Sequence, residues 1–79
     1  MITIDHKKRI YEQIYIQIKN QILNGELKKG DKLPPTRFMA KEYGISRNSV
    51  VSAYEQLRVE GYINSVIGSG FFVESIDVQ

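Results

Sequence analysis

The stretch that decides the fold is Ala40-Lys-Glu-Tyr-Gly44-Ile-Ser-Arg-Asn-Ser-Val50, in the middle of a chain of 79 residues. Two helices that cross closely through a short turn need a small residue on the first helix, and Ala40 stands at that position. Gly44 supplies a turn residue that tolerates positive φ. Val50 supplies an aliphatic side chain that faces back from the second helix. This spacing predicts a helix-turn-helix, although helical hairpins that bind nothing also show it.

The spacing of the apolar residues that precede this stretch predicts one further helix. The three expected helices cover residues 9–24, 36–43 and 47–60. Thr36 and Ser46 are the expected N-caps of the second and third helices, and Gly44 ends the second. Ile16 and Leu23 project away from the main apolar stripe of the first helix. They either widen the core or contact a second subunit or domain, and the sequence supports both interpretations equally.

The periodicity changes after the third helix. Two β-rich stretches, residues 62–67 and 71–74, flank Gly68-Ser-Gly70, which predicts a hairpin over residues 62–74. Lys32-Leu33 is expected to form a very short strand before two prolines stop it. The fold class is therefore mainly α with a small β hairpin, a winged helix-turn-helix with three helices plus a wing.

Length and composition limit the organisation to one small domain. We expect a flexible basic arm at residues 1–8, the winged helix-turn-helix at 9–74, and the start of a linker to an absent effector domain at 75–79. The chain is 42% apolar and has no cysteine, so packing alone must stabilise it. No apolar run approaches the ~20 residues of a membrane span. We expect a cytoplasmic protein with no membrane partner.

The residues on the outward face of the third helix indicate the function. When Val50 packs inward, the side chains that point outward are those of Asn48, Ser49 and Ser52, with Arg47 at the first turn. No residue from 46 to 54 is acidic, which suits insertion into the major groove of a duplex. Arg47 is the candidate for guanine and Asn48 for adenine. The alternative is that Ser46 and Ser49 merely cap the helix and that Arg47 is a solvated charge.

Two further elements are candidates for contacts with the DNA backbone. Arg37 begins the second helix and is expected to clamp a phosphate, the alternative being a surface ion pair with Glu42 or Glu60. Gly68 and Ser69 at the wing tip are expected to meet the backbone or the minor groove, the alternative being a plain hairpin turn. The chain has one histidine and no paired base and nucleophile, so we expect neither an enzyme nor a metal site.

The sequence resembles the N-terminal DNA-binding domain of GntR-family bacterial transcription regulators. The matching segments are Tyr11-Glu-Gln-Ile14, Gly25-Glu-Leu27, Gly30-Asp-Lys-Leu-Pro34, Arg37, Tyr43-Gly-Ile-Ser-Arg-Asn-Ser-Val50, Gly61-Tyr-Ile63 and Gly68-Ser-Gly-Phe-Phe-Val73. The stretch from Ser46 to Leu57 followed by Glu60-Gly-Tyr62 looks most like the MocR subfamily. That subfamily fuses this domain to a large domain that binds pyridoxal phosphate.

The resemblance implies DNA contacts at Arg37, Ser46, Arg47, Asn48, Ser49 and Gly68. Family members often carry a basic or amide side chain just before the first wing glycine, where this chain has Ser65, Val66 and Ile67. We therefore expect Gly68 and Ser69 to touch only the backbone. The resemblance also implies no cofactor in this chain and pyridoxal phosphate in an absent C-terminal domain.

The leading hypothesis is a sequence-specific DNA-binding domain of a bacterial transcription regulator. Its partners would be double-stranded DNA and, in the full-length protein, a second copy in a homodimer. Helix 47–60 would enter the major groove. The alternative is a winged-helix module for protein–protein contact without DNA binding, which would need an apolar exposed patch on that helix.

Overall fold

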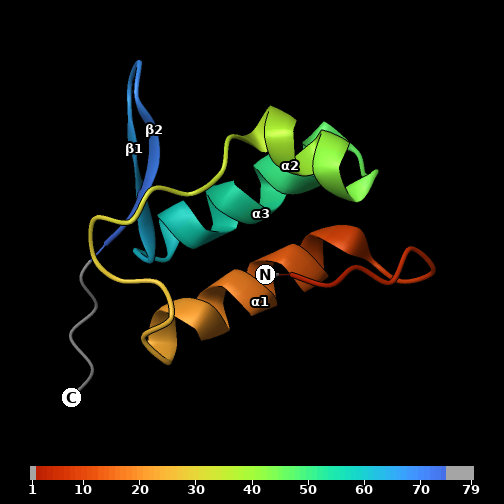
Figure 1. Cartoon of the computed structure of the whole chain (residues 1–79), viewed down its shortest axis with the longest axis horizontal. Coiled ribbons are helices and arrows are strands. Elements are labelled where there is room, and N and C mark those ends of the chain that lie inside the picture. The colour runs from red at the N-terminus through yellow and green to blue at the C-terminus, as the bar shows by residue number, and fades with distance from the viewer. Residues whose placement is uncertain (1, 75–79) are drawn as a thin grey trace.

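The computed structural model describes residues 2–74, which form three helices followed by an antiparallel hairpin (Figure 1). The elements are α1 (Ile10–Leu23), α2 (Thr36–Tyr43), α3 (Arg47–Val59), β1 (Ile63–Val66) and β2 (Gly70–Val73). Helices α1 and α2 both pack on α3, and the hairpin stands at the C-terminal end of α3. The predicted fold class is confirmed. The ends of the helices and strands differ from the expected ones by at most one residue, as fraying ends do.

One apolar core joins every element. Its members are Ile2, Ile14, Ile18, Ile22, Leu33, Met39, Val50, Ala53, Tyr54, Leu57, Ile63 and Val73. The buried residues of α3 recur at helical spacing, so the opposite face of that helix must point to solvent. Ile16 and Leu23 remain 44% and 46% exposed, so the interpretation that they widen the core is wrong. Their contact with a second subunit or domain stays a prediction.

The turn between α2 and α3 has the predicted geometry. Gly44 adopts a left-handed conformation with φ of 62°, and the Ile45 amide donates to the carbonyl of Ala40 at 3.0 Å. Ser46 caps α3, because its Oγ accepts the Asn48 amide at 3.1 Å. The predicted cap at Thr36 is wrong. Pro35, extended at φ −58° and ψ 147°, occupies that position, and Thr36 is already helical.

The hairpin pairs Ile63 with Val73 and Val66 with Gly70. The segment before α2 runs beside β2 as a third, irregular edge. The Leu33 amide donates to Phe71 O at 2.9 Å, and the Val73 amide donates to Asp31 O at 2.8 Å. The expected short strand is thus reduced to a single bridge at Lys32. Two prolines follow directly and cannot extend a ladder of hydrogen bonds.

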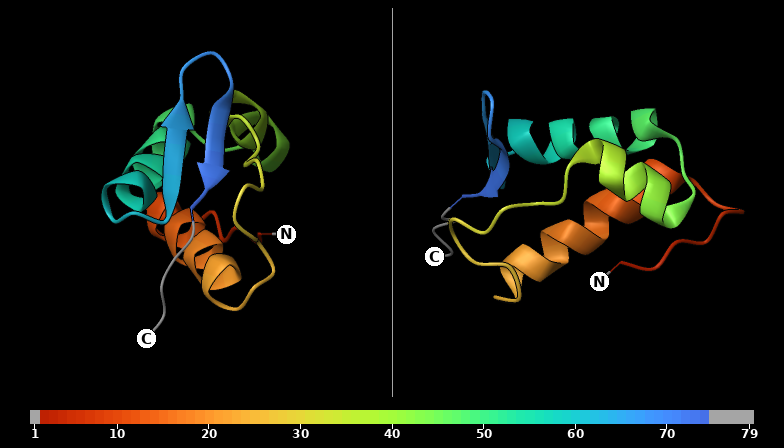
Figure 2. Two further views of the ribbon diagram at one scale, coloured as in Figure 1. Left: turned by 90° about the vertical axis from the view of Figure 1, so that its left-hand side faces the viewer. Right: turned by 45° about the horizontal axis from the view of Figure 1, so that its top comes forward.

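The N-terminal segment lies against the domain, which corrects the expectation of a free arm. Ile2 is 8% exposed and belongs to the core. The Thr3 amide donates to Gln17 Oε1 at 2.8 Å, and Gln17 Nε2 donates to Thr3 O at 2.7 Å. Figure 2 shows this segment running back along α1. The predicted linker at residues 75–79 lies outside the described residues.

Candidate nucleic-acid interface

The first two turns of α3 present their polar side chains to solvent, as predicted. Ser46, Arg47, Asn48 and Ser52 are exposed, and Ser49 is half-buried. On the opposite face of the helix Val50, Ala53 and Leu57 are fully buried. The buried face holds the helix in place, so the polar face keeps a fixed orientation.

Arg47 is held at the start of α2. Its Nε donates to Thr36 Oγ1 at 3.3 Å, a contact that helical periodicity does not predict. The two terminal nitrogens of the guanidinium group form the edge that pairs with guanine O6 and N7. Within residues 2–74 the Arg47 side chain donates through Nε alone, so Thr36 orients this edge without occupying it.

The acidic residue of α3 that comes first after its polar N-terminal face is Glu55, in the third turn. Arg58 Nε donates to the two Glu55 carboxylate oxygens at 3.2 and 3.1 Å. These hydrogen bonds lower the pKa of Glu55. The carboxylate is therefore charged at neutral pH, but Arg58 offsets its repulsion of an approaching phosphate.

Arg37 is exposed at the second position of α2. The ion pairs formed within residues 2–74 join Arg9 to Glu12 and Arg58 to Glu55. Glu60 instead accepts hydrogen bonds from Tyr15 and Gln56. The alternative of an ion pair from Arg37 to Glu42 or Glu60 is therefore wrong, and the guanidinium group is available to a phosphate.

The wing tip is a tight turn with exposed backbone. Gly68 has φ of 80°, and the Ser69 amide donates to Val66 O at 3.0 Å. Gly68 and Ser69 are exposed, and Ile67 is 100% exposed. The hairpin, the segment from 32 to 36 and the start of α2 enclose a cleft of about 360 Å³. The structure thus brings the wing and α2 to one surface.

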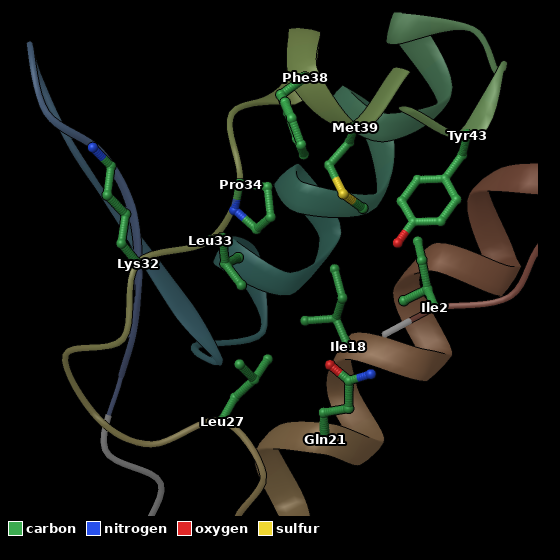
Figure 3. A pocket seen from close by; sticks show the side chains of 10 residues that line it. All are labelled: Ile2, Ile18, Gln21, Leu27, Lys32, Leu33, Pro34, Phe38, Met39 and Tyr43. Carbon is green, nitrogen blue, oxygen red and sulfur yellow. The ribbon is translucent and has the colours of Figure 1, made fainter. Parts of the chain in front are cut away.

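A separate cavity of about 190 Å³ opens between α1, α2 and the segment before α2 (Figure 3). Its walls are mainly apolar and include Ile2, Ile18, Leu33, Met39 and Tyr43. No group of three or more metal-ligating side chains occurs in the part of the chain that the structure describes. Within that part, no helix has the length and apolar character that crossing a membrane requires.

Two contacts that organise the interface were not predicted. One is the Arg47 contact with Thr36. The other is made by Tyr54, whose hydroxyl donates to Pro34 O at 2.6 Å while its ring meets Phe71 edge-on at 5.1 Å. Burial raises the pKa of Tyr54 above its ordinary value. Tyr54 thus joins α3, the wing and the approach to α2.

The fold and the exposed polar helix define a winged helix-turn-helix domain. Residues 10–73 match the family model described as "Bacterial regulatory proteins, gntR family", and the chain belongs to that family. It is 40% identical over 78 residues to the probable rhizopine catabolism regulatory protein MocR of Rhizobium meliloti. That match covers 96% of this chain and 16% of the relative. The chain therefore spans about a sixth of that relative's length.

Solved structures of related proteins support the same fold and family. YtrA from Sulfolobus acidocaldarius, a GntR-family transcription factor, superposes with a TM-score of 0.84 at 41% identity. The match covers 96% of this chain and 82% of YtrA. The DNA-binding domain of AraR, solved in complex with operator ORX1, gives a TM-score of 0.73 at 30% identity. It covers 80% of this chain and 76% of that one. The chain is a GntR-family winged-helix DNA-binding domain.

Proposed function

We propose that this domain reads duplex DNA with the N-terminal half of α3 in the major groove. Arg47 and Asn48 would contact base edges, and Ser46, Ser49 and Ser52 would allow the helix to approach closely. Arg37 would bind a backbone phosphate from α2. Gly68 and Ser69 would meet the backbone through the exposed wing turn.

The observation that carries the proposal is the polar, acid-free surface of residues 46–54, held outward by a fully buried opposite face. Protein–protein contact would need an apolar patch there. On α3 the exposed large hydrophobic residues are Val51 at 44% and Val59 at 67%, and exposed polar side chains stand between them in the sequence, at Ser52, Glu55 and Gln56. The AraR domain, similar in fold and sequence, was solved on operator DNA, which supports the same partner for this chain.

Two substitutions test the assignment of roles. Arg47→Ala should cost about 1–3 kcal/mol of binding and relax base preference at one position. Arg37→Ala should weaken all sequences alike and reduce the salt slope by about one. Binding is measured by fluorescence anisotropy against a duplex recovered by selection and against its single-base variants. A uniform loss in Arg47→Ala would reassign Arg47 to phosphate, and no binding at low salt would favour the protein-contact alternative.

For the whole protein, we propose a homodimeric transcription regulator of the MocR type, with effector sensing by a pyridoxal phosphate domain outside this chain. The similarity to the rhizobial MocR protein supports this proposal. The test is to purify the product of the native gene. Visible absorbance of a bound pyridoxal group and a dimeric mass in solution are expected. A colourless monomer would contradict both parts.

A further inference from the structure

The wing, taken as β1, β2 and the turn between them, carries no charged side chain. Residues 61–73 contain neither a basic nor an acidic side chain. Yet the hairpin forms one wall of the 360 Å³ cleft, and the other wall is the segment of residues 32–36 that leads into α2. Of the side chains that line this cleft, the one that carries a charge is Lys32. A cation from a different segment therefore occupies the surface between the wing and α2.

The position of Lys32 is fixed by its backbone and by β2. The flanking hydrogen bonds from Leu33 to Phe71 and from Val73 to Asp31 tie its main chain to the hairpin. Its side chain then crosses β2 at Gly70, where a Cβ atom would lie 3.2 Å from Lys32 Cε. Figure 3 shows this side chain running along the hairpin, away from the apolar residues of the cavity. A glycine at position 70 thus leaves room for the lysine.

We propose that Lys32 binds a phosphate of the DNA backbone in this cleft and supplies the positive charge that the wing lacks. This inference rests on the proposed function. A duplex that contacts both Arg37 on α2 and Ser69 on the wing must span the cleft, and duplex DNA carries about one negative charge per 1.7 Å of its axis. A lysine ammonium suits such a contact because it binds phosphate as a point charge from varied directions.

The experiment compares Lys32→Gln with Lys29→Gln in the 79-residue chain. Both changes remove one positive charge from the same loop, but Lys29 lies at a hollow on the opposite face of the hairpin, lined by Asn64, Phe72 and Glu74. The two hollows share only Val66 and Ser69 at the wing tip. The probe is a fluorescein-labelled pool of random duplexes of about 20 base pairs, two helical turns. Binding is measured by anisotropy over a series of salt concentrations.

Lys32→Gln should reduce the slope of log K against log salt by about 0.9, which weakens binding about eightfold at about 0.1 M salt. Lys29→Gln should change binding less than about twofold, because an exposed charge away from the DNA is screened by salt. Lys32→Arg should restore the wild-type slope. This conservative variant separates loss of the charge from damage to the hairpin, because it keeps the charge while altering the packing over Gly70.

The outcomes separate the two proposals. If the wild-type chain binds no duplex at any salt concentration, the proposed function itself fails. If the wild type binds and Arg37→Ala weakens it, but Lys32→Gln matches Lys29→Gln, only the role of Lys32 is overturned. A wild-type slope in Lys32→Gln, or a slope in Lys32→Arg as low as in Lys32→Gln, also overturns it.

Discussion

Replacing Tyr54 with phenylalanine isolates one hydrogen bond that holds the interface together. The Tyr54 ring is fully buried, and its hydroxyl donates to Pro34 O at 2.6 Å. Phenylalanine keeps the ring, and with it the edge-on contact with Phe71 at 5.1 Å. Pro34 is itself exposed, so water can reach part of its freed carbonyl. The expected cost is therefore about 1 kcal/mol, the net value of one hydrogen bond, and not the larger penalty of a sealed acceptor.

For a domain of this size, that cost corresponds to a fall of about 4–8 °C in Tm. The assay is thermal and urea denaturation followed by circular dichroism. Tyr11→Phe is the matched control, because the Tyr11 ring is half-buried and its hydroxyl makes no hydrogen bond within the described residues. Equal Tm values for Tyr54→Phe and the wild type would show that the Pro34 bond contributes nothing in solution. A loss above about 3 kcal/mol would mean that the ring itself repacks.

Tyr54→Phe should also change how the free energy of unfolding depends on pH in alkaline solution. Burial raises the pKa of Tyr54 in the folded chain above the ordinary value near 10. The native state therefore binds more protons than the unfolded state above that pH. The stabilisation is complete below about pH 10 and is lost as pH rises toward the folded pKa. The free energy of unfolding of Tyr54→Phe should fall less steeply above about pH 10 than that of wild type. Equal slopes would contradict this reasoning.

Three shorter predictions test the rest of the fold. Gly44→Ala should cost about 1–2 kcal/mol in urea denaturation, because a Cβ there meets no atom within 4 Å and only the left-handed backbone is strained; Gly44→Asn should cost less. Hydrogen bonds from Tyr15 and Gln56 lower the pKa of Glu60, so its stabilisation is present above about pH 4.3 and lost as pH falls below it. The free energy of unfolding of Glu60→Gln should therefore fall less than that of wild type as the solution is made acidic. Ile2→Ala should lower the free energy of unfolding by about 2 kcal/mol, and an unchanged value would restore the free-arm interpretation.

The sequence predicted the helix-turn-helix because its determinants are local. Gly44, Ser46 and the apolar spacing on α3 act within a few residues of one another. Each has a known conformational preference, so the turn, the cap and the outward face follow from the order of residues. The hairpin was predictable for the same reason, because its turn glycines lie directly between the two β-rich stretches.

The N-terminal segment could not be predicted in the same way. Ile2 and Ile4 alternate with polar residues in a pattern that a disordered end also shows. Their burial depends on a site built by α1, where Gln17 offers both a donor and an acceptor to the backbone of Thr3. Nothing near residue 2 in the sequence indicates that site.

The contacts that align the interface are also non-local. Arg47 meets Thr36 across 11 residues, and Tyr54 meets Pro34 across 20. Both depend on the angle at which α2 crosses α3, which apolar spacing constrains only loosely. Polar side chains have no periodicity that would specify such partners. Candidate site residues were therefore identifiable, but the way they are held was not.

Tyr54 connects the three elements that carry the residues proposed to contact one duplex. Arg37, Arg47 and Lys32 belong to α2, α3 and the loop beside the wing, and a rigid DNA backbone requires fixed distances among them. Tyr54 contacts the wing through Phe71 and the approach to α2 through Pro34, while it is itself part of α3. Movement of any one element would break a contact at this residue. These contacts would favour one arrangement of the three elements before DNA is bound, and a preorganised surface loses less entropy on binding.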